Sequence, residues 1–342
     1  MIAKKWLRIF IPILPNHIPV MGKKKGNSNS KRDNLLKAVS ERKITIVHLS
    51  HNDLDAAGCD AVHRMKYGAI FTIWSSVGSF PSFLRDIGAL PGKGHTLSIS
   101  DLGYCTDADK LVKKAIRNGW IINWRDHHRW TDDELISIQE TGATCRVDTT
   151  QCATGVCAED LMPNDATAEE VARVVCDYDL WKNADPRSKM LGQICTKRVN
   201  LNPVRDRLVK GIITDDWIEE EYRTIEKERQ DAIKKSIKKM KIIESRYKIA
   251  FAPIFGYPSE TAHEIRDIYH TDIEVIYGAN GRFSIRSNVP ISHLIARQFS
   301  GGGHPPAAGG TFNLTLKDKI SLFFLKKARC FDELVQVADK LP

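Results

Sequence analysis

The feature that most constrains the fold is an alternation of short apolar runs with helical segments. The runs 44–50, 69–76, 95–103 and 120–128 are rich in β-branched residues and are bounded by polar or glycine-containing stretches. Residues 107–119, between the last two runs, have helical spacing and end on a glycine, as a C-cap would. Strands that alternate with helices favour a parallel sheet, so the sequence predicts an α/β domain.

A long charged stretch separates this pattern from a second, smaller α/β segment. The chain has 342 residues, which favours two domains. Residues 217–246 contain few apolar positions and are interpreted as a solvated connecting helix, with a basic nucleic-acid arm as the less favoured reading. Strands are expected near 247–252, 273–278 and 282–287, and a helix near 291–299. The expected domains are a catalytic domain over 43–216, the helix over 217–246 and a second domain over 247–342.

Residues 1–42 are expected to lie outside the fold. The apolar stretch 6–20 is interrupted by prolines and is too short for a membrane span. The polar run that begins at Met21 is predicted to be disordered, and translation is expected to start at Met21 rather than Met1. No association with a membrane is predicted.

Charge and cysteine content indicate the kind of partner and compartment. The formal net charge is +9, which favours a polyanionic partner such as nucleic acid. The eight cysteines include no CxxC pair, and they are interpreted as reduced core residues of a cytoplasmic protein.

Acidic and histidine side chains gather where the predicted strands end. They follow the first, third and fourth strands and the helix that begins near Thr167, as His51, Asp53, Asp55, Asp101, Asp126, His127, His128, Asp177 and Asp179. Because ligands bind at the carboxyl ends of strands in such sheets, we expect these groups to converge. Converging carboxylates need cations between them, and mixed carboxylate and imidazole ligation suits Mn²⁺ or Mg²⁺. Two such ions, about 3.5–4 Å apart, can drive a phosphoryl displacement.

These motifs resemble those of the DHH phosphoesterase superfamily. The triplet Asp126-His127-His128 matches the one that names the family, HNDLDAAGC and SISDLG match its first two motifs, and DYDLW is similar to the fourth. The segment 283–312, with GGGH followed by Ala-Ala-Gly, resembles the DHHA1 substrate-binding domain. The resemblance implies an N-terminal parallel-sheet DHH domain and a smaller C-terminal α/β DHHA1 domain, joined by the long helix.

The family implies roles for the matched residues. The implied metal ligands are His51, Asp53, Asp55, Asp101, His127 and Asp177. Asp101 would bridge two ions, and His51 is either a ligand or a supporting group. Asp179 is the rival of Asp177. Among the catalytic residues, His128 would contact the scissile phosphate and Asp126 would orient His127 or nearby backbone.

The second domain is expected to hold the substrate. Arg286 can grip phosphate with its bidentate fork, and Ser287 and His304 supply further hydrogen bonds. Gly301, Gly302 and Gly303 would let the backbone approach a ligand and offer N–H groups to phosphate.

The resemblance therefore implies a RecJ-like, metal-dependent exonuclease that is most similar to nanoRNases. It would hydrolyse short single-stranded RNA or DNA in the 3′→5′ direction to nucleoside 5′-monophosphates, using two Mn²⁺ ions, with Mg²⁺ as the alternative. Two further readings stay open: a phosphatase or phosphodiesterase for adenosine 3′,5′-bisphosphate or for cyclic or linear dinucleotides, and a non-catalytic nucleic-acid-binding subunit. The sequence also leaves a homodimer open.

Overall fold

The computed structural model describes residues 28–315, 317–318, 321 and 328–341, and the expectations for residues 1–27, including the start at Met21, lie outside them. The chain forms two compact units that divide in the sequence between Cys176 and Asp177. The division falls inside one helix, α7 (Ala166–Asp179).

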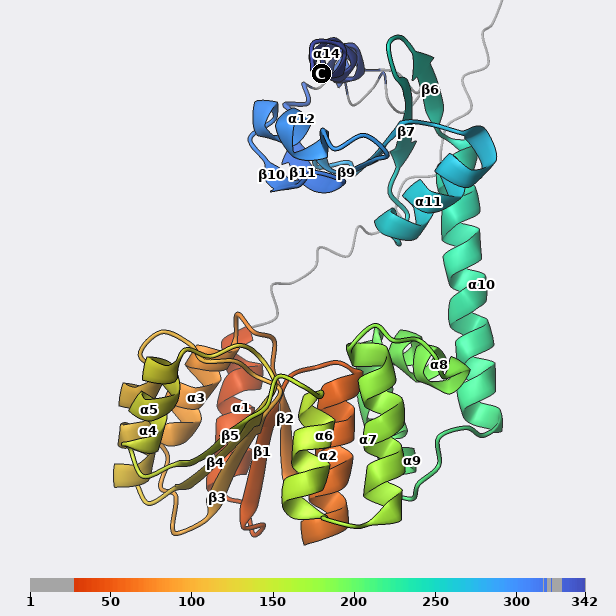
Figure 1. Cartoon of the computed structure of the whole chain (residues 1–342). Coiled ribbons are helices and arrows are strands. Elements are labelled where there is room, and N and C mark those ends of the chain that lie inside the picture. Colours follow the sequence, from red (N-terminus) through yellow and green to blue (C-terminus); the bar gives the residue numbers. More distant parts are fainter. Residues whose placement is uncertain (1–27, 316, 319–320, 322–327, 342) are drawn as a thin grey trace, which may run out of the picture. The chain divides into compact units, whose positions relative to one another are not determined.

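The first unit is built on a parallel sheet of five strands in the order β2-β1-β3-β4-β5 (Figure 1). The strands are β1 (Ile46–Ser50), β2 (Phe71–Trp74), β3 (Thr96–Ser100), β4 (Ile121–Asp126) and β5 (Thr144–Val147). All neighbouring pairs are parallel. The predicted α/β class is therefore confirmed, and four of these strands lie within predicted runs, whereas β5 was not predicted.

Helices cover both faces of this sheet, and the two faces differ in chemistry. The helices are α1 (Ser28–Ser40), α2 (Leu54–Tyr67), α3 (Phe80–Gly88), α4 (Ala108–Arg117), α5 (Asp132–Gln139), α6 (Ala153–Leu161) and α7. Val47, Leu97 and Ile122 belong to the apolar core shared with α1, α3, α4 and α5. Alternate strand residues on the α2 and α6 face are polar and buried, among them His48 and Ser98. This face of the sheet therefore carries a hydrogen-bonded network, and the helices above it, α2, α6 and α7, share an apolar cluster of their own.

Helix α1 corrects the expectation that residues 1–42 lie outside the fold. Val39 is fully buried in the apolar core that contains Val47 and Leu97, and Leu35 and Leu36 pack against this core. Arg32 forms an ion pair with Asp86 of α3. The apolar residues of this short helix recur on one side, so it can pack although the segment is polar overall.

The strand order places a topological switch point next to β1. The chain moves from β1 to β2 on one side and then to β3 on the other. Helices that follow strands on opposite sides of such a point leave a crevice at the carboxyl ends of the strands. β1, β3 and β4 are neighbours, and Ser50, Ser100 and Arg125 are aligned across them. The acidic motifs that follow these strands are therefore brought to one place.

The second unit combines a helical segment with a mixed sheet. Its helices are α8 (Pro186–Cys195), the short 3-10 helix η1 (Arg198–Asn200), α9 (Leu201–Leu208), α10 (Asp216–Lys238), α11 (Pro258–Tyr269), α12 (Ser292–Gln298) and α14 (Arg329–Asp339). Its strands are β6 (Lys241–Glu244), β7 (Lys248–Pro253), β8 (Ile273–Tyr277), β9 (Arg282–Ser287), β10 (Gly302–His304) and β11 (Ala307–Thr311).

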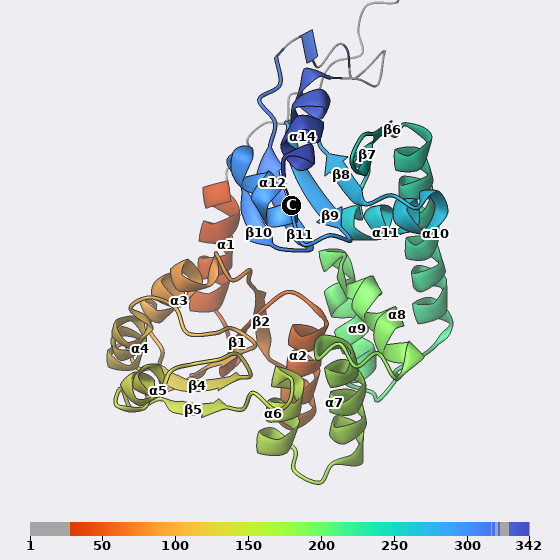
Figure 2. The same cartoon turned by 45° about the horizontal axis from the view of Figure 1, so that its top comes forward.

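These six strands follow the order β10-β11-β9-β8-β7-β6, with α11 on one face and α12 and α14 on the other (Figure 2). Two expectations change here. The long helix ends at Lys238 instead of 246, because residues 241–244 form strand β6 and pair with β7. The glycine run contributes a strand, β10, which pairs with β11.

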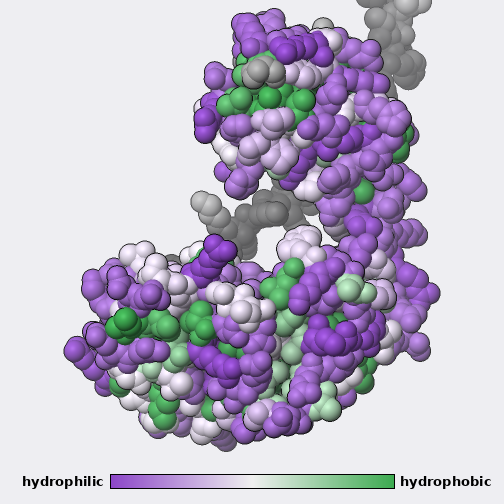
Figure 3. Space-filling model, viewed as in Figure 1, coloured by the Kyte–Doolittle hydropathy of each residue, from purple (hydrophilic) through white to green (hydrophobic). Residues whose placement is uncertain are grey.

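The cysteines depart from the expectation of free thiols. Cys152 and Cys176 form a disulfide that joins α6 to α7, while six other cysteines are free. Among the described residues, no helix combines the length and the apolar character that a membrane crossing requires. Hydrophilic residues cover most of the visible surface of each unit (Figure 3).

Candidate metal centre

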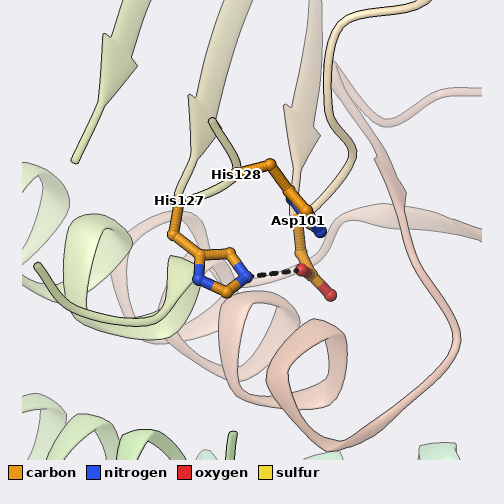
Figure 4. Close-up of side chains that lie close together, drawn as sticks. All are labelled: Asp101, His127 and His128. Atoms are coloured by element: carbon orange, nitrogen blue, oxygen red, sulfur yellow. Dashed lines mark ion pairs between the residues drawn. The ribbon is translucent and has the colours of Figure 1, made fainter. Parts of the chain in front are cut away.

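Asp101 lies at the centre of the acidic and histidine side chains of the first unit. It follows β3 directly, is only 3% exposed, and adopts the left-handed backbone conformation with φ of 54°. Its Oδ1 is 3.4 Å from His127 Nε2, and its Oδ2 is 3.7 Å from His51 Nδ1. Figure 4 shows the approach of Asp101 to His127. The two oxygens of this one carboxylate therefore face two different potential ligands, His127 and His51.

The first group follows β1. Asp53 is the N-cap of α2, and its Oδ1 accepts a hydrogen bond from the backbone N–H of Ala56. Its Oδ2 lies 2.7 Å from Nδ1 of His51. His51, Asp53 and Asp101 each offer a ligand atom, and these atoms lie within 4.8 Å of one another. The start of α2 thus binds Oδ1 of Asp53, while Oδ2 of Asp53 faces His51.

The second group joins the ends of β1 and β4. His127 Nε2 lies 3.7 Å from Oδ2 of Asp55, in addition to its approach to Asp101. Asp55 is almost fully buried on the first turn of α2. Its two oxygens accept hydrogen bonds from the backbone N–H groups of Ala153 and Thr154, which open α6, at 2.8 and 2.7 Å. The amides and dipole of a helix N-terminus stabilise a carboxylate, so the start of α6 holds Asp55 in place.

His128 is positioned by the aspartate that precedes it in the triplet. Its Nδ1 is 2.8 Å from Oδ1 of Asp126, which is fully buried, and Oδ2 of Asp126 accepts a hydrogen bond from Trp130 Nε1 at 2.8 Å. Asp126 was expected to orient His127 or backbone, but the structure places its carboxylate against His128. The His128 side chain is 47% exposed. His128 also belongs, with Asp101 and His127, to a group whose ligand atoms lie within 4.8 Å of one another.

The electrostatics of the centre show a surplus of negative charge. Burial and the neighbouring Asp55 raise the pKa of Asp101 well above its usual value. The neighbouring carboxylates of Asp101 and Asp53 raise the pKa of His51 to about 10. Burial alone would raise the pKa of Asp53, but the hydrogen bond and charge of His51 outweigh it, and the pKa is lowered. A proton on His51 therefore offsets negative charge that a cation would neutralise.

The residues of this centre could hold a divalent metal ion. Among the described residues, Asp101 Oδ2 is buried and has no hydrogen-bond partner, and such an orphaned acceptor is costly unless an unseen group satisfies it. Asp101 belongs both to the group with His51 and Asp53 and to a group with His127 and His128. Carboxylate oxygens mixed with imidazole nitrogens suit Mn²⁺ and related ions. Asp101 is thus the residue that these two groups have in common.

The fourth acidic motif closes α7, and its first aspartate is engaged by the segment that follows. Asp177 accepts hydrogen bonds from the backbone N–H groups of Ala184 and Asp185 and from the hydroxyl of Ser188. The Ser188 bond and these amides lower its pKa. Its carboxylate therefore braces the connection to α8, which leaves Asp179 as the stronger candidate ligand of the motif.

In the second unit, Arg286 sits on β9 with its guanidinium fixed by neighbours. It donates to the hydroxyls of Ser284 and Ser259, at 2.9 and 2.8 Å, and is partly exposed. Ser287 behaves differently: it is 3% exposed, and its hydroxyl contacts Val289 O and the Ser292 hydroxyl. The geometry of Ser287 favours an anchoring role over direct contact with substrate.

Two of the three glycines in the GGGH segment, Gly301 and Gly303, are required by close packing. A Cβ on Gly301 would lie 2.0 Å from Gly309 O, and one on Gly303 would lie 2.6 Å from Ala308 Cα. Gly303 also has a φ of 143°. A Cβ on Gly302 would have no atom of the described residues within 4 Å, so this glycine, like the exposed His304, borders open space. Of the predicted glycines, Gly302 is thus the one whose surroundings leave room for a ligand.

Sequence reasoning missed two contributors to the centre. The α6 amides that hold Asp55 are 98 and 99 residues away in the chain, and nothing in a local pattern predicts such a contact. Trp130, which holds Asp126, could have been found, because it stands four residues after the aspartate.

Comparison with known proteins gives a likeness of fold. No family model matches the sequence, and no curated protein matches it significantly. Among solved structures, the pGpG-specific phosphodiesterase PggH from Vibrio cholerae has a TM-score of 0.50 at 10% identity, covering 86% of this chain and 99% of that one. Exonuclease RecJ bound to manganese has a TM-score of 0.49 at 15% identity, covering 90% and 95%. RecJ from Thermus thermophilus with Mn²⁺ has 0.46 at 15%, covering 90% and 55%.

The fold is similar to that of the phosphodiesterase PggH, in line with the two α/β units that the sequence predicted. At these identities the likeness concerns the fold and not the reaction. The chemistry has to be inferred from the site.

Proposed function

We propose that this protein is a two-metal phosphodiesterase that hydrolyses short single-stranded oligonucleotides, RNA in the first place, from the 3′ end to nucleoside 5′-monophosphates. The observation that carries the proposal is the buried carboxylate of Asp101, whose two oxygens face His51 on one side and His127 on the other. That arrangement fits a bridging ligand between two cations. Two bridged ions can activate water and hold both the attacking and the leaving oxygen of a phosphodiester.

The protein residues in this proposal have separate tasks. Asp53, Asp55, Asp101 and His127 supply the oxygen and nitrogen atoms for the cations, with His51 beside them. Asp179, the rival reading of the fourth motif, completes the set in preference to Asp177. Asp126 orients His128, whose half-exposed ring contacts the phosphate and stabilises the charge that develops on it.

The preference for short substrates rests on charge and on the second unit. A net charge of +9 suits a polyanionic substrate. Arg286 is held ready by two serine hydroxyls and can take one terminal phosphate, with Gly302 and His304 as neighbouring contacts. PggH, which shares the fold, is specific for pGpG, a substrate of two nucleotides. A short oligonucleotide is therefore the best-supported substrate.

The test is hydrolysis of a substrate panel by chelated protein to which Mn²⁺ is returned. The panel contains RNA and DNA of two to about twenty-four nucleotides, labelled at either end, with adenosine 3′,5′-bisphosphate, pGpG and cyclic dinucleotides beside them. We expect the fastest hydrolysis for oligonucleotides of a few units, with 5′-monophosphates as products.

Each alternative reading has its own outcome in this panel. Turnover confined to the bisphosphate, or to dinucleotides, would move the assignment to those substrates. Binding of oligonucleotides without any metal-dependent hydrolysis would favour a non-catalytic binding subunit.

A further inference from the structure

The loop between α7 and α8 presents an aromatic ring to solvent. Trp181 is 83% exposed, the largest exposed fraction among the large hydrophobic side chains of the described residues. Tryptophan is usually well buried because its ring contributes much of the free energy of folding. A ring that the fold leaves in water therefore needs an explanation outside the folded core.

The backbone that carries this ring is strained and firmly held. Trp181 and Asn183 both have positive φ, 57° and 49°, a conformation that side chains other than glycine rarely adopt. The backbone N–H groups of Lys182 and Asn183 donate to Asp177 O, at 3.0 and 3.1 Å. The Asp177 carboxylate accepts hydrogen bonds from the next two backbone N–H groups, those of Ala184 and Asp185. Local strain of this kind persists where the surrounding structure fixes it, and it is frequent at ligand-binding sites.

A second aromatic ring supports the first from within the unit. Trp181 lies nearly parallel to Tyr178, with an interplanar angle of 23° and ring centroids 6.4 Å apart. The Tyr178 ring in turn lies against Gly192 of α8, where a Cβ would come within 2.2 Å of it. Gly192 thus makes room for the supporting ring, and the position of Trp181 is fixed before any ligand arrives.

We propose that Trp181 is a stacking platform for a base of the nucleic-acid substrate, a proposal that rests on the proposed function. The residues that follow, Lys182, Asn183 and Ala184, are exposed and are polar or small. A protein-docking patch would require several contiguous apolar side chains. A single fixed ring among polar neighbours suits a planar base, and Lys182 beside it can meet a phosphate. Asp177 then acts as a positioning residue for Trp181.

The experiment compares wild type with Trp181→Ala and Trp181→Phe in Mn²⁺-dependent hydrolysis. The substrates are a trinucleotide RNA and its three analogues that each lack one base. Base stacking on an aromatic residue changes affinity by roughly 5- to 150-fold. Trp181→Ala should raise KM for the trinucleotide within that range and leave kcat nearly unchanged, while Trp181→Phe should keep most of the affinity. Val199→Ala, at a residue that is 79% exposed in the same unit, is the control and should behave as wild type.

The analogues make the result specific to a base. For one abasic analogue, the KM with wild type should equal the KM of the full trinucleotide with Trp181→Ala. The KM of that analogue should not rise further in Trp181→Ala. Equal losses on all analogues, or no loss at all, would overturn the platform, and no loss would favour a protein partner at this ring. If wild type hydrolyses no oligonucleotide, the proposed function falls and the platform with it; if only the variant comparison fails, the proposed function stands.

Discussion

The side chains of the centre are held by hydrogen bonds that select one orientation for each. Asp126 accepts from His128 and Trp130, and Asp55 accepts from two amides of α6. These partners fix the orientation of His128 and Asp55 around Asp101. Groups that hold metal ligands and catalytic histidines in place typically change activity or affinity by about 10- to 100-fold when removed.

Replacing Asp126 tests this positioning. In Asp126→Asn one of the two hydrogen bonds is lost, because the amide offers only one acceptor oxygen to His128 and Trp130. We expect kcat to fall roughly 10- to 100-fold with little change in KM. The control is Asp132→Asn, at an exposed residue of α5. Steady-state kinetics with a trinucleotide decide the matter, and an unchanged kcat would mean that His128 needs no support from Asp126.

Metal binding should depend on pH. The pKa of His51 is raised to about 10 and that of Asp101 is also raised, so the metal-free centre keeps at least one proton at neutral pH. Mn²⁺ must displace it, and each released proton raises the apparent affinity by about tenfold per pH unit. The affinity should therefore increase from pH 6 to pH 8. Calorimetric titrations in two buffers of different ionisation enthalpy would measure the released proton. An affinity that does not change over this range would contradict the account.

At the scale of elements, the sequence predicts where groups converge but not how they are braced. Apolar runs ending in acidic motifs predicted β1, β3 and β4, because burial on both faces of a parallel sheet makes such strands continuously apolar. The same reasoning placed Asp53 and Asp101 at one sheet edge. It did not predict which aspartate of the fourth motif is engaged by its own loop, because Asp177 and Asp179 differ only in their tertiary partners. Nor did it predict β5, β6, β10 or β11, which are short strands of three to five residues and carry little sequence signal of their own.

The disulfide gives a prediction at this scale. Cys152 is the N-cap residue of α6, whose first amides hold Asp55, and its bond to Cys176 ties that helix end to α7. A loop of 24 residues closed by a disulfide contributes about 3 kcal/mol to stability. The double variant Cys152→Ser, Cys176→Ser should unfold at lower urea and bind Mn²⁺ more weakly, since the α6 amides lose their fixed position.

The control for this comparison is Cys105→Ser, at a partly exposed free cysteine. Wild type treated with a dithiol reductant should unfold as the double variant does. Identical urea curves for the oxidised, the reduced and the doubly substituted protein would show that the bond contributes nothing.

At the scale of the whole molecule, the proposed function places the chemistry on the acidic motifs at the ends of β1, β3, β4 and α7, and recognition at the mixed sheet that carries Arg286. Arg286→Ala removes a charged hydrogen-bond donor that contributes about 1.5–3 kcal/mol. KM for a trinucleotide should rise by roughly one to two orders of magnitude. The kcat on bis-p-nitrophenyl phosphate should stay nearly constant, because a minimal phosphodiester has no terminal phosphate for Arg286.

Arg282→Ala, at an exposed arginine of the same strand, is the matched control and should leave both substrates unaffected. Equal loss on both substrates in Arg286→Ala would mean that Arg286 supports the fold or the centre, and this division between chemistry and recognition would be wrong.

The measurement that tests the central claim most directly is Mn²⁺-dependent hydrolysis of an end-labelled trinucleotide by wild type and by Asp101→Asn, with bound Mn²⁺ counted in both. Asp101 is buried and its carboxylate faces both ligand groups, so its neutral replacement should keep a normal melting curve, bind fewer than two ions and lose activity by several orders of magnitude. Wild-type turnover by folded Asp101→Asn, or full activity of the wild type after exhaustive chelation, would contradict a centre built on a bridging aspartate.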